Sequence, residues 1–300
     1  MLLTDLHNAH RRHLMSLRRA PGTADYYRHA VNSLVRYMEA QGLEPTLENV
    51  DRPLLREFVL HLRERGLKPG GEHATMRGLR ATVRWAVEEE YIASDPFRGF
   101  KLTSVPQVMP PSVSDDEARI ALRVAGEMNQ PLRNKALLLL LLDTGLRMSE
   151  AIQLRVGDVD IERGIVTVRA ETSKRQKERR VPLGVKASKV LGQYLRRERE
   201  PARPLVQELF LTRSGMPMTR GGLHGLLRRI ADLGGIEQNH LSPHAWRRAF
   251  ATMVIRNGGD VFTLREMMGH ATLEQTRVYL RLSDEDLQRV HMRVSPVDRL

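Results

Sequence analysis

Seven consecutive apolar residues, Ala136 to Leu142, constrain the fold of this chain more than any other stretch of its sequence. Alanine and leucine are strong helix formers, so the run predicts a helix that is apolar on every face. Such a helix is stable in water only at the centre of a domain, with other elements packed around it. The run is far shorter than the roughly 18 to 20 apolar residues of a membrane span. It therefore predicts the central helix of a soluble domain, and no membrane partner is expected.

The residues on either side of this run predict further helices. Ser114 followed by Glu117 forms a capping box, which opens one helix before the run. After the run, Asp143-Thr144-Gly145 breaks the helical pattern, and a new helix is expected to start near Arg147. Everything after Gly184 reads as helical again, apart from the short apolar stretch 209–211.

Between these helices, residues 157–183 carry the pattern of strands. Apolar residues flank the turn Glu162-Arg163-Gly164, and Arg180 to Leu183 can form a third short strand after a polar turn at 173–177. The fold class expected is therefore mainly α, with a small three-stranded antiparallel sheet in the second part of the chain.

The first hundred residues read as helical throughout. Thr23 is expected to cap a helix that Gly42 ends, and two more helices are expected at 53–65 and 73–91. Residues 103–113 include three prolines and resist both helix and strand, so they are expected to join two domains. A length of 300 residues agrees with about two domains of roughly 150 residues each.

The charge of the chain indicates a polyanionic partner. It has 48 basic and 36 acidic residues, a net charge of +12, and since seven of the 48 are lysines, 41 are arginines. Guanidinium groups contact phosphate in a planar, bidentate way, which suits nucleic acid. A GC-rich genome would enrich arginine in the same way, so composition alone does not decide. The chain has no cysteine, which excludes disulfides, thiolate metal sites and cysteine nucleophiles.

Two stretches carry cations that suit phosphate chemistry. Arg147 and Glu150 lie three residues apart on one helical face, where the carboxylate can hold the guanidinium as a fixed fork for phosphate oxygens. A structural ion pair at a helix start would have the same pattern. The second stretch is a turn that can reach into DNA or can remain merely solvated, and its cations are Lys174, Arg175 and Lys177.

Two later stretches add imidazole, guanidinium and phenol groups. Ser242 as N-cap and Pro243 at the first position define a helix start, whose backbone donors suit an anion. The apolar stripe of this helix places His244 opposite the core and Arg247 at the flank of the stripe. The last stretch contains His270, after a glycine stop, and Tyr279; alone, that tyrosine could equally be an ordinary core residue.

In this order the four stretches resemble the boxes of the tyrosine recombinase (phage integrase) superfamily, in particular its Xer-type site-specific recombinases. TGLRMSE resembles the first arginine box, KRQKERRVPL the hairpin with the catalytic lysine, LSPHAWRRAFAT the His-x-x-Arg box, and MMGHATLEQTRVYL the box that ends in the nucleophile. The resemblance covers about residues 10–290. Two residues depart from the pattern: Arg248 stands where a histidine is usual, and Trp246 replaces a smaller aliphatic residue.

The resemblance implies a site-specific DNA recombinase that cleaves and rejoins strands through a 3′-phosphotyrosyl intermediate and a Holliday junction, without metal, ATP or another cofactor. Tyr279 would be the nucleophile. Arg147 and Arg247 would clamp the non-bridging oxygens of the phosphate, with His244 and His270 as further donors.

The resemblance also implies the proton transfers. His244 would accept the proton of the tyrosine, and Lys174 would be the general acid for the departing 5′ oxygen, with Lys177 as its competitor. Glu150 would orient the first arginine. Further DNA-binding candidates are Arg175, Lys177 and Arg248.

The implied architecture is a two-domain DNA clamp: a helical core-binding (SAM-like) domain at 1–102, the linker at 103–113, and an α+β catalytic domain at 114–300. The segment of about 283–300, in which Ser283 with Asp286 can cap a short helix, is expected to pack on a neighbouring protomer. The implied partners are double-stranded DNA with inverted half-sites and a homotetramer on synapsed DNA. A partner recombinase or an accessory DNA-bending or translocase protein stays open. With no secretory signal visible, a cytoplasmic, nucleoid-associated location is expected.

Two other functions fit part of the pattern. A type IB topoisomerase shares the tyrosine chemistry but relaxes supercoils as a monomer, and a non-catalytic DNA-binding relative would need no complete set of catalytic positions. The His244-x-x-Arg247 box and the Xer-like first domain favour a recombinase over the topoisomerase, and the presence of all six catalytic positions argues against the non-catalytic relative. The spacing of His7, His10 and His13 suits a metal site less well than a solvated helical face, so no metal is expected.

Overall fold

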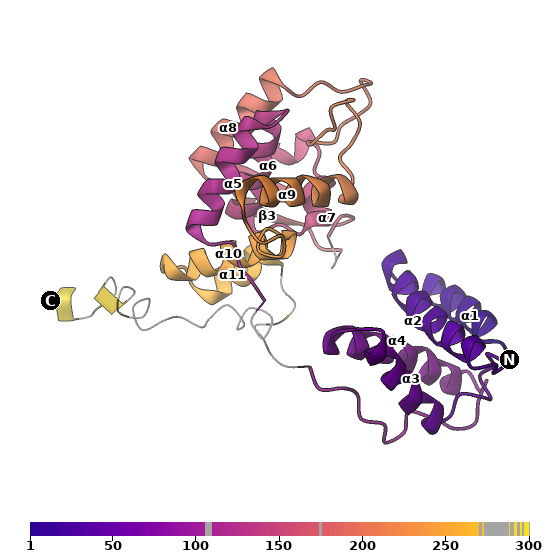
Figure 1. Ribbon diagram of the computed structural model, residues 1–300. Coiled ribbons are helices and arrows are strands. Elements are labelled where there is room, and N and C mark those ends of the chain that lie inside the picture. Colours follow the sequence, from indigo (N-terminus) through magenta and orange to yellow (C-terminus); the bar gives the residue numbers. More distant parts are fainter. Residues whose placement is uncertain are drawn as a thin grey trace. The chain divides into compact units, whose positions relative to one another are not determined.

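The computed structural model describes residues 1–105, 110–173 and 176–269, together with 272, 288, 291, 292, 295 and 297–299. The chain divides into two compact units, residues 1–108 and 109–300, and both consist mainly of helices (Figure 1). The boundary falls within the proline-containing segment. Among the helices that the structure describes, none combines the length and the apolar character that crossing a membrane requires.

The first unit is helical throughout. Its helix α2 packs against α1 and α4, and α3 packs against α4. Leu6, Leu34 and Phe58 are among the side chains that this packing buries almost completely. Its helices are α1 (Leu3–Ser16), α2 (Pro21–Ala40), α3 (Arg52–Glu64) and α4 (Pro69–Glu88).

Two helices of this unit begin earlier than the sequence predicts. Helix α2 begins at Pro21 rather than after a cap at Thr23, and α4 begins at Pro69, four residues before the predicted start. In both helices a proline occupies the first turn, where its missing N–H is not needed and its fixed φ suits the helix. The stop at Gly42 is confirmed, and its φ of +72° is the left-handed value that favours glycine.

The histidines of α1 correct a second expectation. His7 and His10 are buried, with exposed fractions of 6% and 4%, so the prediction of a solvated face is wrong for both. The ring of His10 lies between the rings of Tyr27 and Trp85, at centroid distances of 5.0 and 4.7 Å. Burial, followed by the charges of His13 and His7, lowers the pKa of His10 to about 4. Within the described parts of the chain, no group of three or more His, Asp or Glu side chains could hold a metal ion.

The second unit is built around the predicted apolar helix, which is α6 (Pro131–Thr144). Its residues Leu137 and Leu138 have no exposed surface, and it packs against α5, α8 and α10 (Figure 1). The capping box of Ser114 and Glu117 at the start of α5 is confirmed. The other helices of this unit are α5 (Asp115–Glu127), α7 (Met148–Ile152), α8 (Val185–Arg197), α9 (Arg220–Gly234), α10 (Pro243–Arg256) and α11 (Val261–Met268), with short 3-10 turns η1 (Val156–Asp158) and η2 (Val297–Arg299).

The predicted small sheet is confirmed. Strands β1 (Val159–Asp160), β2 (Ile165–Val168) and β3 (Arg179–Pro182) pair antiparallel in the order β1-β2-β3. Val166 lies opposite both Val159 and Val181, and the sheet buries Val166 and Val181 in the core.

The prediction of helix after Gly184 is wrong for residues 198–208 and 212–219, whereas the predicted exception at 209–211 is confirmed. Leu209 instead donates its N–H to the carbonyl of Leu154 at 2.7 Å, and Leu211 forms an isolated bridge with Pro217. Three prolines in this stretch disfavour a continuous helix.

Candidate active site

The carboxylate of Glu150 lies at the centre of the first arginine box. Helix α6 ends at Gly145, whose φ of +57° is left-handed, and Arg147 caps the short helix α7. The backbone N and the Nη1 of Arg147 donate to the two carboxylate oxygens of Glu150, at 2.8 and 2.9 Å. Burial opposes ionisation of Glu150, but hydrogen bonds and the charges of Arg179 and Arg147 outweigh it and hold its pKa below the ordinary value.

Arg179, the first residue of β3, is the second cation on this carboxylate. Its Nη1 and Nη2 donate to the Glu150 oxygens at 3.1 and 2.6 Å, and its Nε donates to the carbonyl of Met267 at 2.9 Å. Arg179 was not among the predicted site residues, because its partner lies 29 positions away. The pair Arg179-Arg180 in a strand could have indicated it: alternate residues face the core, so one of the two needs a buried carboxylate.

Helix α10 places Arg247 in the same cluster. Its predicted start is confirmed, since the Ser242 side chain accepts the N–H of Ala245 and Pro243 occupies the first turn. Arg247 is 5% exposed. Its Nη2 donates to the carbonyl of Met268 at 2.7 Å, and its Nη1 donates to the carbonyl of Gly145. Arg247 therefore connects the end of α6 with the end of α11.

Three guanidinium groups converge on the carboxyl end of α11. The carbonyls of residues 267, 268 and 269 accept hydrogen bonds from Arg179, Arg247 and Arg147, in that order, and the last is 3.3 Å long. A helix ends with partial negative charge on its last carbonyls, so cations are stabilised there. The cluster thus collects positive charge around one buried carboxylate.

His244 lies at the amino end of α10 and is exposed, as the sequence predicts. Partial burial, followed by the charges of Arg248, Arg247, Arg147 and His224, lowers its pKa below the ordinary value. A lowered pKa favours the neutral form of His244, which is the form that can accept a proton. His224 on α9 was not among the predicted site residues, because it lies outside the four stretches that carry the pattern.

Some of the remaining predicted residues lie within the described parts of the chain, and the others do not. Lys177 is exposed before β3, and the Nε of Arg248 donates to the carbonyl of Pro111 at 2.7 Å. Trp246 is fully buried in the core. The predictions for Lys174, Arg175, His270, Tyr279 and the cap at Ser283 fall outside the described residues.

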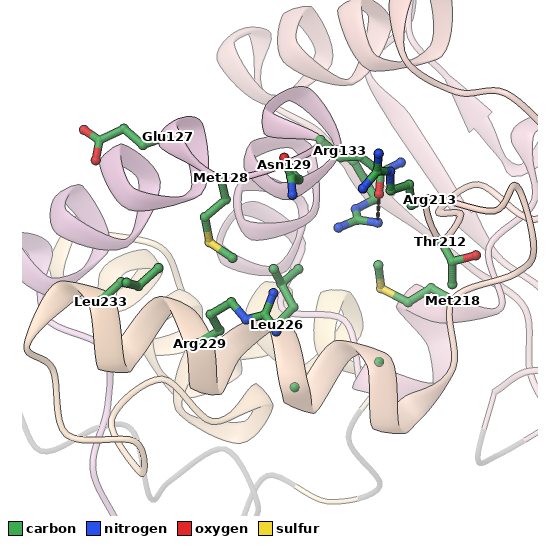
Figure 2. A pocket seen from close by; sticks show the side chains of 13 residues that line it. Glu127, Met128, Asn129, Arg133, Thr212, Arg213, Met218, Leu226, Arg229 and Leu233 are labelled. Carbon is green, nitrogen blue, oxygen red and sulfur yellow. Dashed lines mark hydrogen bonds between the residues drawn. The ribbon is translucent and has the colours of Figure 1, made fainter.

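A cavity of about 680 Å³ lies between α9, the facing ends of α5 and α6, and residues 212–218 (Figure 2). Met128, Met218 and Leu226 point into it. The described residues that line this cavity include none of the predicted catalytic ones, so the arginine cluster is the better candidate for the active site.

Family models match both units. The model described as "Phage integrase family" matches residues 112–286, and "Phage integrase SAM-like domain" matches residues 4–102. This chain belongs to the phage integrase family. The predicted resemblance is confirmed, and so is the fold class, with a SAM-like amino-terminal domain and a carboxyl-terminal catalytic domain that contains the small sheet.

Individual relatives extend over most of the chain. It is 31% identical over 256 residues to tyrosine recombinase XerC of Pelotomaculum thermopropionicum, which covers 83% of this chain and 82% of the relative. It is 29% identical over 288 residues to tyrosine recombinase XerD of Xanthomonas campestris pv. campestris, covering 91% and 86%. The structure of the Tn1549 transposon integrase in complex with transposon right end DNA has a similar fold, with a TM-score of 0.77, 22% identity and coverage of 98% and 99%.

Proposed function

We propose that this phage integrase family member is a site-specific DNA recombinase that cleaves and rejoins strands through a 3′-phosphotyrosyl intermediate at Tyr279. The observation that carries the proposal is the cluster in which Arg147 and Arg247 meet the end of α11. The charges of these arginines also lower the pKa of His244. The Xer names of the relatives agree with this activity.

The arginines suit the charge that develops during strand cleavage. In the transition state, negative charge spreads over the two non-bridging oxygens of the phosphate, and Arg147 and Arg247 would donate to them. Glu150 holds Arg147 in place before the substrate arrives, so little reorganisation is needed. His270 would be a further donor. Removing one such preorganised donor costs about 3 to 4 kcal/mol of transition-state stabilisation.

The proposed step balances without a cofactor. The phenolic oxygen of Tyr279 forms a bond to phosphorus as its proton passes to His244, and the bond to the 5′ oxygen breaks as Lys174 protonates that oxygen. The phosphotyrosyl bond retains the energy of the phosphodiester, so rejoining reverses the step without ATP.

The DNA-binding surface would extend beyond the reacting groups. Lys177 is exposed before β3, and Arg175 precedes it in the sequence. Helix α9 exposes three further groups at intervals of one turn: Arg220, His224 and Arg228. The charge of His224 is among those that lower the pKa of His244, which supports a basic stripe that leads to the site. Duplex DNA with inverted half-sites is the proposed substrate, at the nucleoid in the cytoplasm.

Recombination would take place in a homotetramer on synapsed DNA and pass through a Holliday junction. We place the carboxyl-terminal segment of 283–300, with Leu287 and Val290, in an apolar groove of a neighbouring protomer. A groove of suitable character, about 790 Å³ in volume, lies between α6, α8, α10 and α11, and Leu139, Val185 and Phe250 are among its lining residues. A partner recombinase or an accessory protein could join this assembly.

A nicked suicide substrate tests the proposed function. The chain should form a covalent adduct with this DNA, and Tyr279→Phe should form none while binding the same half-site. Relaxation of a supercoiled plasmid that lacks any specific site would favour the topoisomerase instead. An adduct that persists in Tyr279→Phe would refute Tyr279 as the nucleophile.

A further inference from the structure

The chain enters the second unit along the helix that carries the candidate site. Val113 is 3% exposed, and its N–H donates to the carbonyl of Ala245 at 3.5 Å. Arg248, one turn further along α10, donates from Nε to the carbonyl of Pro111 at 2.7 Å. These two contacts hold residues 110–114, which we call the junction segment, against the first turns of α10.

A third connection joins the start of α5 to the start of α10. Glu117 accepts the backbone N–H of Ser114 at 2.8 Å, and its other carboxylate oxygen lies 2.7 Å from Nδ1 of His240. His240 comes three residues before Pro243, where α10 begins. The junction segment and the amino ends of both helices therefore form one hydrogen-bonded block.

The same helix end faces the candidate site. His244 lies one turn before Arg248 on α10, next to the buried Arg247. Besides partial burial, the groups that lower the pKa of His244 are Arg248 and Arg247 on α10, Arg147 at the start of α7 and His224 on α9. Arg248 therefore contributes both a hydrogen bond to the junction segment and a charge to the surroundings of His244.

We propose that Arg248 is a positioning residue: it fastens the chain that arrives from the first unit to α10, and so fixes the placement of His244 and Arg247 when the first unit binds DNA. The inference rests on the proposed function for the role of His244. A guanidinium suits this task because it keeps its charge at every relevant pH and donates in a fixed plane. A histidine, usual at this position in the Xer pattern, changes its charge near neutral pH and would not give a constant field.

Three substitutions separate this role from a direct contact with DNA. Arg248→Met removes the charge and the Nε donor, whereas Arg248→Lys keeps the charge but lacks that donor. Arg119→Met is the matched control, since Arg119 is an exposed arginine of α5 that pairs with Asp116 at 2.8 Å. The measurements are half-site affinity, the single-turnover cleavage rate on saturating suicide substrate across pH, and amide hydrogen exchange of the junction segment.

For Arg248→Met, we expect the cleavage rate to fall on the order of tenfold to a hundredfold at saturating DNA, as misplaced reacting groups would cause. The acidic limb of its pH–rate profile should move to higher pH, because His244 loses a neighbouring charge, and amide exchange of the junction segment should rise. Arg248→Lys should show the faster exchange but keep the acidic limb. Half-site affinity should not change, and Arg119→Met should match the unsubstituted chain.

Weaker half-site binding with an unchanged cleavage rate at saturation would make Arg248 a DNA contact and overturn the inference. Unchanged exchange in the junction segment of Arg248→Met would overturn it as well. If the unsubstituted chain forms no adduct at all, the proposed function fails, and the exchange measurement still decides whether Arg248 fastens the segment.

Discussion

Arg179 and Glu150 form a two-point ion pair, with nitrogen–oxygen distances of 3.1 and 2.6 Å. The Glu150 side chain has no exposed surface, and that of Arg179 is 11% exposed. Because Arg179 also donates to the carbonyl of Met267, it connects β3 with the first arginine box and with the end of α11. One side chain outside the predicted catalytic set thus connects three of the four boxes.

Replacing Arg179 with methionine should destabilise the second unit. The substitution leaves the buried carboxylate of Glu150 with one of its two cations, and breaking a buried ion pair costs about 3 to 5 kcal/mol. Since Arg147 remains, we expect a loss near the lower end of that range in the free energy of unfolding, measured in urea. The control Arg163→Met breaks an exposed pair with Asp160, 3.7 Å long, and should cost less than about 1 kcal/mol. If both variants lost the same free energy of unfolding, burial would not be what makes the Arg179–Glu150 pair important.

His10 should make the stability of the first unit depend on pH. In the unfolded chain it binds a proton below about pH 6.5, its ordinary pKa, whereas in the folded chain it stays neutral down to a pKa of about 4. The unfolded state therefore gains protons first as the pH falls. Stability should be lost between pH 6.5 and 4, by on the order of 3 kcal/mol for the whole shift.

This loss can be measured by urea unfolding at pH 7 and pH 4.5. The signal is the fluorescence of Trp85 in a chain that also carries Trp246→Phe. His10→Phe keeps an aromatic ring between its neighbours and should remove most of the pH dependence. His29→Gln replaces an exposed histidine of the same unit and should leave it intact. If His10→Phe retains the full dependence, another group is responsible.

The variants Lys174→Ala and Lys177→Ala should respond differently to a DNA substrate that has a sulfur leaving group. Lys174→Ala should cleave normal DNA poorly, because the 5′ oxygen then departs without a proton. A 5′-bridging phosphorothiolate leaves as a thiolate that needs none, so it should restore cleavage by this variant. Lys177→Ala is the control, with little effect expected on either substrate. If the phosphorothiolate restored cleavage only in Lys177→Ala, the general acid would be Lys177.

Deleting the residues after Ser283 should separate binding from assembly. Binding to a half-site should persist, whereas tetramers on synapsed DNA should decrease, as measured by native gels and analytical ultracentrifugation. Val185→Glu should cause the same decrease from the opposite side of the contact, since Val185 lines the apolar groove and is 86% exposed. An undiminished tetramer yield in both variants would exclude this groove as the docking site.

Local patterns predicted most of the fold because their causes lie within a few residues. Ser114 and Ser242 were identified as helix caps, since the donor and the acceptor are both close in sequence. The burial of His10 could not be predicted in this way, because it depends on Trp85, which lies on another helix. Arg179 was missed for the same reason: what matters for a buried charge is a distant carboxylate.

The predicted catalytic residues followed from the order of the four boxes, but their electrostatics did not. The sequence placed Arg147 and Glu150 on one face of a helix and left open whether the pair was only structural. The structure adds the second cation on Glu150 and the neighbours that lower the pKa of His244. Both arise from elements that meet only in the folded unit.

The carbonyls of residues 267–269 have a consequence for target choice. In the protein alone, these oxygens accept N–H groups of Arg147 and Arg247, the same side chains that would donate to the scissile phosphate. Each guanidinium has five N–H groups, so a phosphate could bind the same arginine beside the backbone contact or in place of it. Where a phosphate takes a shared N–H, it would weaken the hold of that arginine on the end of α11, so DNA binding and this attachment would be thermodynamically linked. In the proposed recombinase, such linkage would favour cutting at sequences that bind tightly enough to offset the lost backbone contact.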